Sequence, residues 1–440
     1  MTTENVAPTA DSSPQQSRGY PRSEVLRDSG DEPFVRAPRS SWQAKATWQR
    51  VARVMVRQWS VWAGSPTRVS LLALCAGILI VVARLALAAH GQPGDFVVAG
   101  RDLANPSLVP HGIRVFPGTG YDGQFFYRIA LDPANFSRRA FGIRIDASYR
   151  FQRIGYPAIA WLASLGGIHL LVPWSLIGVN LVSIGAVAYV GALLARQAGR
   201  HSAWGLLMVG YFGFPFSLSR DTAEIVTAAF TLGGVVALRE RRWILAAVVL
   251  SAAVLTRETP VLVVFAYGIL RIVGLARRRE LPSVADLAWV LPGVVFVGWQ
   301  GLVSLFSPTP VASDLASNLG LPFVAMGRAA VHWFTSLPAP AADLWVEQAV
   351  ILIVVIALAD TVWRETTARP NERLAYVLLV CLSVSLAYGI WNGQADFRSF
   401  SETYLFAILV LFESRKRLGP VAVLVALAWL PVVVHQVVFI

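Results

Sequence analysis

Long apolar blocks dominate the chain, and short polar breaks rich in arginine separate them. Most blocks are roughly 16 to 24 residues long, close to the about 20 residues that an α-helix needs to cross a bilayer. The pattern therefore predicts about eleven membrane-spanning helices. The blocks cover residues 68–90, 173–195, 203–219, 222–238, 242–256, 259–276, 286–306, 346–363, 374–391, 401–413 and 417–438.

Composition agrees with this pattern, since 55% of the residues are apolar and only 15% are charged. In hydrocarbon every backbone N–H and C=O must be paired within its own segment, which favours helices. We therefore expect an all-α, polytopic transmembrane bundle in the cell membrane, with the membrane domain occupying residues 68–440.

The first part of the chain has a different character. Residues 1–40 are rich in Ser, Pro and charged residues, and such a segment buries too little apolar area to fold, so we expect a disordered cytoplasmic tail. Residues 41–67 place tryptophans on one helical face and arginines on the other. This pattern predicts a basic amphipathic helix that binds anionic membrane lipids.

Arginines in short loops are retained in the cytoplasm, which orients the spans. The arginine-rich breaks alternate correctly, with a cytoplasmic N-terminus and an extracytoplasmic C-terminus, if residues 156–171 form an interfacial helix instead of a span. Two long loops, 91–153 and 307–345, then face outward.

The net charge of +12 comes from arginines at the ends of apolar blocks, so it reflects membrane topology and does not indicate nucleic-acid binding. The two cysteines and six histidines show no ligand spacing. We expect neither a disulfide nor a metal site from them.

Candidate chemistry begins with Asp122, in a run of glycines and aromatics just after the first span. Its carboxylate can accept a proton from a hydroxyl, which makes it a candidate catalytic base. Tyr121, Gln124 and Tyr127 are candidate substrate-binding neighbours, because aromatic rings offer stacking surface for a sugar or a prenyl chain. An Asp-Gly turn in a solvated loop is the equally open alternative.

A second cluster, Arg220, Asp221 and Glu224, lies at an outer junction between two blocks. The carboxylates can share a helical face, although Asp221 is also well placed to cap a helix. Glu224 lies one turn deeper, where a carboxylate is costly without a partner.

Two further pairs lie at outer junctions, Arg257 with Glu258 and Asp396 with Arg398. A guanidinium group is well shaped for a phosphate, so both arginines are candidate ligands of a lipid-linked phosphate. A local ion pair between Arg257 and Glu258 is the alternative.

These motifs together resemble the GT-C glycosyltransferases, polytopic membrane enzymes that use lipid-phosphate-linked sugars. The resemblance rests on Gly-Tyr-Asp-Gly-Gln-Phe-Phe-Tyr at 120–127, on Tyr-Arg-Phe-Gln-Arg-Ile-Gly-Tyr-Pro at 149–157, on Arg-Asp-Thr-Ala-Glu at 220–224 and on Thr-Arg-Glu-Thr at 256–259. In that superfamily an acidic residue in the first outer loop is the catalytic base, the position that Asp122 occupies here.

The resemblance implies inverting, hexosyl or mannosyl transfer from a polyprenyl-phosphate sugar to a cell-envelope glycan or glycolipid on the extracytoplasmic face. Asp122 has no second acid within two positions, unlike the metal-dependent oligosaccharyl members, so we expect no cofactor and a metal-free reaction. A transporter or flippase of a lipid-linked or anionic solute is the main alternative, and a membrane scaffold is a third.

Overall fold

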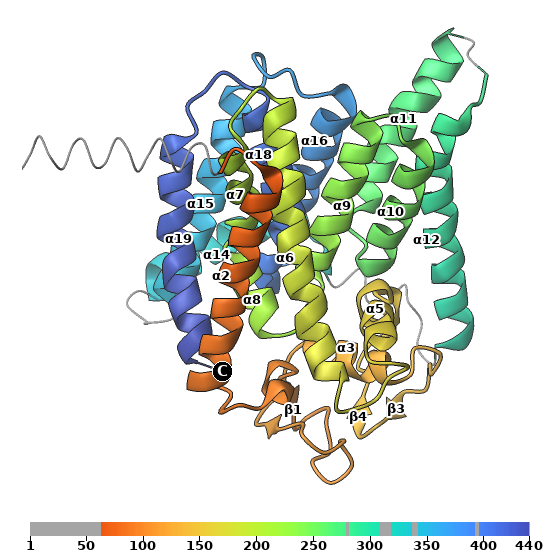
Figure 1. Cartoon of the computed structure of the whole chain (residues 1–440), viewed down its shortest axis with the longest axis vertical. Helices are drawn as coiled ribbons and strands as arrows, with labels where there is room; N and C mark the ends of the chain where they lie inside the picture. Colours follow the sequence, from red (N-terminus) through yellow and green to blue (C-terminus); the bar gives the residue numbers. More distant parts are fainter. Residues whose placement is uncertain (1–62, 279–280, 308–317, 337–341, 392–395, 440) are drawn as a thin grey trace, which may run out of the picture. The chain divides into compact units, whose positions relative to one another are not determined.

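The computed structural model describes residues 63–278, 281–307, 318–336, 342–391 and 396–439, and these are mostly helical (Figure 1). The predicted tail and nearly all of the predicted amphipathic helix at 41–67 lie outside these residues. The α-helices are α2 (Pro66–Leu87), α3 (Gly123–Leu131), α4 (Tyr149–Gln152), α5 (Gly155–Ala163), α6 (Val172–Gln197), α7 (Leu206–Val209), α8 (Gly213–Ser219), α9 (Glu224–Arg239), α10 (Trp243–Thr256), α11 (Val261–Arg278), α12 (Leu287–Phe306), α14 (Val324–Ser336), α15 (Ala342–Thr361), α16 (Pro370–Val384), α17 (Tyr388–Trp391), α18 (Ser401–Phe412) and α19 (Gly419–Val438).

Four of these helical stretches are long and apolar enough to cross a membrane: Pro66–Leu87, Val172–Gln197, Val284–Phe306 and Gly419–Val438. Large apolar side chains on them stay exposed, such as Leu79 on α2 and Val297 on α12, each at 69%. Exposed apolar surface on long helices is typical of a protein whose outer face meets lipid. The expectation of a mostly helical chain is confirmed, and four stretches have the length and apolar character that spans require.

At the opposite extreme, α18 is buried along its whole length and packs against α15 and α16. Its first turn nevertheless contains Glu402. A carboxylate at the start of a fully buried helix needs a partner nearby. That partner belongs to the site described below.

Several expected spans have a different form in the structure. Residues 203–219 are divided among a 3-10 turn, η2 (Ser202–Gly205), and two short helices, α7 and α8. The break at 210–212 has a local cause, because Pro215 has no N–H to donate to the carbonyl of Tyr211. The block 374–391 is also interrupted, since α16 ends at Val384 and α17 begins at Tyr388.

The expected outer loop 307–345 is partly helical, because α14 occupies 324–336 and α15 begins at Ala342. The expected interfacial segment 156–171 contains α5, which has nine residues. At 1.5 Å per residue such a helix is about 14 Å long, too short to cross the hydrocarbon core.

The segment 91–153 folds into a small structure beside one end of the helices (Figure 1). Strand β1 (Ala99–Gly100) pairs in parallel with β2 (Val115–Phe116), and β3 (Arg139–Ala140) pairs antiparallel with β4 (Ile143–Arg144). It also contains η1 (Pro93–Phe96), α3 and α4. Its own apolar cluster includes Val97, Phe126 and Tyr156, which anchors it to α5.

Candidate active site

Backbone packing fixes Asp122 just before α3. Gly120 has a φ of +70°, and a Cβ there would lie 2.3 Å from the backbone nitrogen of Gly100. A Cβ on Gly123 would meet the backbone oxygens of Arg220 and Val97 at 2.5 and 2.8 Å. Both glycines are therefore required for the close approach of backbone segments around the carboxylate.

The carboxylate of Asp122 forms no cap hydrogen bond to α3, although the residue occupies the N-cap position. Instead Oδ1 accepts a hydrogen bond from Arg150 Nη1 at 2.5 Å, and Oδ2 accepts one from Arg398 Nη2 at 2.5 Å. Arg153 Nη1 lies 3.6 Å from Oδ2. The side chain is 12% exposed, so the structure replaces the solvated-turn interpretation with a mostly buried carboxylate held by three arginines.

Arg398 connects this carboxylate to a deeper layer. Its Nε donates to the hydroxyl of Tyr121 at 2.7 Å and its Nη1 donates to Glu224 Oε1 at 2.6 Å. Arg257 Nη1 lies 3.6 Å from Glu224 and 3.7 Å from Glu402. The buried Glu224 thus has the partners that its depth requires, and Glu402 has a guanidinium within reach.

The alternative interpretation of Arg257 and Glu258, a local ion pair between the two, does not hold in the structure. Glu258 instead accepts two hydrogen bonds from Arg153, at 2.7 and 3.0 Å. Such a bidentate contact fixes the plane of the guanidinium group. Arg153 therefore joins Glu258 to Asp122, and Arg257 is directed toward the deeper carboxylates.

Arg150 is positioned just as firmly. Its Nε and Nη2 donate to Asp146 at 3.0 and 3.1 Å, and its guanidinium lies over the rings of Phe125 and Tyr149 at 4.3 and 4.4 Å. Cation–π contacts and a paired carboxylate hold the charge in one place. An arginine fixed in this way is preorganised to meet an anion.

These side chains surround a cavity of about 510 Å³. Four arginines and three carboxylates line it, together with apolar residues from α16 and α17. The charged lining residues are Asp122, Asp146, Arg150, Arg153, Arg257, Glu258 and Arg398. The lining has an excess of positive charge, so the cavity favours an anionic ligand.

The arginines control the ionisation of the carboxylates. Burial alone would raise the pKa of Asp122, but the charges of Arg150, Arg398 and Arg153 outweigh it and hold that pKa well below its usual range. Burial is likewise outweighed at Glu258, where the charge and hydrogen bonds of Arg153 lower the pKa to about 2. Both groups are anions at neutral pH.

Other residues singled out from the sequence lie around this cavity. Tyr121 and Gln124 line it, and the Gln124 amide also bonds to the backbone of Gly100 and Thr119. Tyr127 is fully buried in the apolar cluster of the 91–153 segment and does not contribute to the described lining. Arg220 stacks on Tyr121 at 5.3 Å, outside the lining residues.

Asp221 does not cap α9, whose N-cap is Ala223. Its backbone has a φ of +49°, its side chain is fully buried, and neither carboxylate oxygen has a hydrogen-bond partner within the described chain. Burial raises the pKa of this carboxyl well above its usual range, against the opposing charge of Arg84. Asp396 begins η4 (Asp396–Phe400), but its side chain lies outside the described structure.

Three important residues were not among the sequence candidates: Arg150, Arg153 and Glu402. The two arginines lie three positions apart around the one-turn helix α4, a spacing that places side chains on one face, so a signal existed. A signal also existed for Glu402, because an acidic residue inside an apolar block indicates a buried partner or a functional role.

Metal dependence is not decided by these side chains. Across the described ranges no three His, Cys, Asp or Glu side chains gather as a possible metal site. The expectation of a metal-free reaction stays a prediction.

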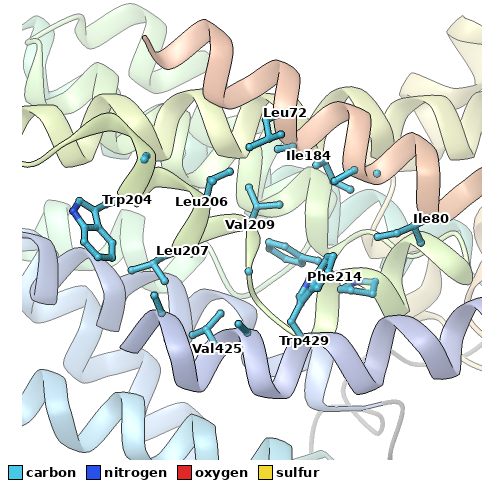
Figure 2. A pocket seen from close by; sticks show the side chains of 18 of the residues that line it. Leu72, Ile80, Ile184, Trp204, Leu206, Leu207, Val209, Phe214, Val425 and Trp429 are labelled. Atoms are coloured by element: carbon cyan, nitrogen blue, oxygen red, sulfur yellow. The ribbon is translucent and has the colours of Figure 1, made fainter. Parts of the chain in front are cut away.

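A second, apolar cavity of about 770 Å³ runs along the bundle between α2 and α19 (Figure 2). Leu72 and Ile80 of α2 border it on one side, and Val425 and Trp429 of α19 on another. Its described lining is apolar apart from His201.

Helix α8 separates the apolar cavity from the charged site. Phe214 and Leu218 line the apolar cavity, whereas Phe216 contacts the ring of Tyr121 at 5.1 Å. A Cβ on Gly213 would lie 2.9 Å from the Cα of Arg398, so α8 touches the site backbone directly. The apolar cavity and the charged site therefore lie on opposite faces of one short helix.

Comparisons with protein-family models, with curated protein sequences and with solved structures find no match for this chain. The GT-C family therefore stays a prediction from the motifs, and the site has to be interpreted from its own geometry.

Proposed function

We propose that this protein is a GT-C-type membrane glycosyltransferase, which moves a sugar from a polyprenyl-phosphate donor to an acceptor hydroxyl with inversion. The observation that carries the proposal is the cavity itself, where Asp122 is surrounded by guanidinium groups of Arg150, Arg153 and Arg398. A buried carboxylate base beside preorganised cations is the arrangement that transfer from a phosphate leaving group needs.

In the proposed reaction the acceptor oxygen attacks the anomeric carbon and forms the new C–O bond. The bond between that carbon and the phosphate oxygen breaks, and its electron pair leaves with the polyprenyl phosphate. Asp122 accepts the proton from the attacking hydroxyl. Arg257 and Arg398 stabilise the negative charge on the departing phosphate, and Glu224 holds Arg398 in position.

The ion pairs of Asp122 make it a weaker base, because a carboxylate with a strongly lowered pKa accepts protons poorly. An incoming lipid phosphate is an anion and competes for the same guanidinium groups. The negative charge of the phosphate offsets that of the arginines, so the pKa of Asp122 rises. Donor binding thus activates the base in this proposal.

The apolar cavity supports a lipid-linked donor. It offers about 770 Å³ of apolar space beside α8, on the face opposite the charged site. A prenyl chain already lies in hydrocarbon before it binds, so the cavity would hold the chain by close packing instead of by removing it from water.

The finer topology is part of the proposal. We propose about eleven membrane passes, a cytoplasmic N-terminus, an extracytoplasmic C-terminus and a reaction on the extracytoplasmic face, as the arginine-rich breaks indicate. The 41–67 segment would bind membrane lipids on the cytoplasmic side. The acceptor would be a cell-envelope glycan or glycolipid.

The proposal is tested by incubating the purified full-length protein with polyprenyl-phosphate mannose or polyprenyl-phosphate glucose and measuring the released polyprenyl phosphate. Loss of the base in Asp122→Asn is expected to reduce release by about 10²- to 10⁴-fold. Asp132→Asn is the matched control, since Asp132 follows the other end of α3 and is absent from the described lining.

Because Asp122→Asn leaves three arginines without their shared partner, Asp122→Glu serves as a second variant that keeps the charge. Thermal unfolding establishes that each variant is folded. Release at the wild-type rate by folded Asp122→Asn would overturn the assignment. A flippase, the main alternative, would move the donor lipid between leaflets of proteoliposomes without releasing polyprenyl phosphate.

A further inference from the structure

A third cavity, of about 720 Å³, lies in the 91–153 segment and plays no part in the mechanism above. The hairpin β3–β4 forms one wall of it and the 101–108 loop forms the other. Three arginines line it, Arg101, Arg139 and Arg144, against a single carboxylate, Asp102.

Within the described chain, none of these three arginines forms an ion pair with an acidic side chain. Arg144 Nη2 donates a hydrogen bond of 3.4 Å to the backbone carbonyl of Asp102. Arg139 and Arg144 are also direct partners across the hairpin. Like charges directly opposite each other in a ladder destabilise it, unless an anion lies between them.

Backbone hydrogen bonds join the hairpin that holds these arginines to the 101–108 loop. Asn105 N–H donates to the carbonyl of Gly142 at 2.8 Å, and Arg144 N–H donates to the carbonyl of Leu103 at 2.8 Å. A Cβ on Gly142 would lie 2.5 Å from the backbone of Leu108. The loop and the hairpin therefore hold the charged side chains around a preformed hollow.

The turn of the hairpin has an unusual residue. Phe141 and Gly142 have φ values of +50° and +73°, as in a type I′ turn, where Asn-Gly is the favoured pair. A bulky side chain in this region is strained, and strain of this kind gathers at functional sites. Phe141 lines the cavity and is 39% exposed, so its ring is presented to a ligand.

The third cavity adjoins the charged site, because Leu103 lines both of them. This proximity to Asp122 favours an acceptor over an unrelated ligand. A hollow lined by arginines and one aromatic ring also suits a chain molecule better than a flat lipid surface.

We propose that this cavity binds an acidic glycan, a sugar chain carrying carboxylate groups, and that this glycan is the acceptor of the proposed transfer. The inference rests on the proposed function for the role of acceptor, but the binding itself does not. Arg139, Arg144 and Arg101 contact the carboxylates of the glycan, and Phe141 stacks against a sugar ring.

The test is binding of a fluorescently labelled oligogalacturonate of defined length to the full-length protein in nanodiscs of neutral phosphatidylcholine. We expect binding that weakens with added salt and that the double variant Arg139→Gln/Arg144→Gln reduces about tenfold. A neutral galacto-oligosaccharide of the same length is expected to bind more weakly and to be unaffected by the double variant.

Arg138→Gln is the matched control, because Arg138 is the adjacent exposed arginine and does not line the cavity. It is expected to change the affinity by no more than about twofold. Equal losses in the control and the double variant, or equal affinity for the two oligosaccharides, would overturn the proposal. The proposal would also be overturned if the acidic oligosaccharide did not bind and the protein instead bound phosphatidylglycerol vesicles through Arg139 and Arg144.

The assay contains no sugar donor and needs no turnover, so its outcome is independent of the Asp122 test. If transfer is demonstrated, the double variant is expected to raise KM for an acidic acceptor, whereas the Arg138→Gln control is not. If transfer is refuted, the cavity can still be shown to bind acidic glycans.

Discussion

At the scale of single residues, Arg153 has a central position because it contacts two carboxylates at once. Its bidentate contact to Glu258 fixes the guanidinium plane, and its third nitrogen faces Asp122. Any proton that binds to Glu258 therefore weakens the hold on Arg153 and, through it, on Asp122. The pKa of Glu258 therefore depends on the contacts that Arg153 makes with both carboxylates.

Glu258 provides a pH prediction. Its pKa is about 2 in the folded chain and has an ordinary value of 4.5, so its ion pair stabilises the fold above pH 4.5 and loses that contribution as the pH falls toward 2. Between these limits the thermal unfolding midpoint of the wild type is expected to fall more steeply than that of Glu258→Gln. Identical slopes for the two proteins would contradict the contribution of this pair.

Much of the charged site was predictable from single residues. Asp122, Glu224, Arg257, Glu258 and Arg398 each stood out as charges among apolar or glycine-rich neighbours, and they do lie close together. Their pairing was not predictable, because adjacent residues such as Arg257 and Glu258 have partners from distant segments. Nor could the pattern show that the ring of Tyr127 turns into an apolar cluster.

At the scale of elements, short pieces of structure position the site. Helix α4 is a single turn that carries Arg150, and α8 is a short helix between the apolar and charged cavities. Hydrophobic periodicity identifies long helices well, but it is weak for pieces of four to seven residues. The long blocks were therefore predicted correctly as helical, and the break before α8 was not.

The start of α3 offers a test of this positioning. Ala in place of Gly123 would bring a Cβ against backbone oxygens on two sides, at 2.5 and 2.8 Å, and neither can move without shifting its segment. Gly123→Ala is expected to destabilise the protein by about 1–3 kcal/mol in thermal unfolding and to displace Asp122.

Gly178→Ala on α6 is the control, because nothing lies within 4 Å of a Cβ at that position. There the helix propensity of alanine should leave the stability unchanged or raise it by up to about 1 kcal/mol. Equal effects of the two substitutions would show that the close approach at Gly123 is unimportant.

At the scale of the whole molecule, α9 joins two buried charge networks. Glu224 in its first turn meets Arg398 and Arg257, and Arg239 in its last turn meets Glu372 and Glu413 at 2.6 and 2.7 Å. Sixteen residues make this helix about 24 Å long. The negative charge of Glu224 at its N-terminus and the positive charge of Arg239 at its C-terminus both complement the helix dipole.

The distant network is expected to serve stability and not chemistry. Glu372→Gln removes the bidentate partner of the buried Arg239 and leaves Glu413 in place, which should cost about 1.5–3 kcal/mol in denaturant unfolding. The exposed neighbouring pair Arg242–Glu240 is the comparison, and Glu240→Gln should cost at most about 1 kcal/mol. A similar small cost for both would mean that burial does not strengthen the Arg239 pair.

The shared hold on Asp122 has a consequence for how this chain can change over evolution. An ordinary ion pair can exchange its two charges in two compensating substitutions. Asp122, however, has three arginine partners: Arg150 in α4, Arg153 directly after α4, and Arg398 in η4. Exchanging Asp122 with any one of these arginines would place a positive charge beside the other two. We therefore expect these four positions to be invariant among homologues, or to be replaced together as a set.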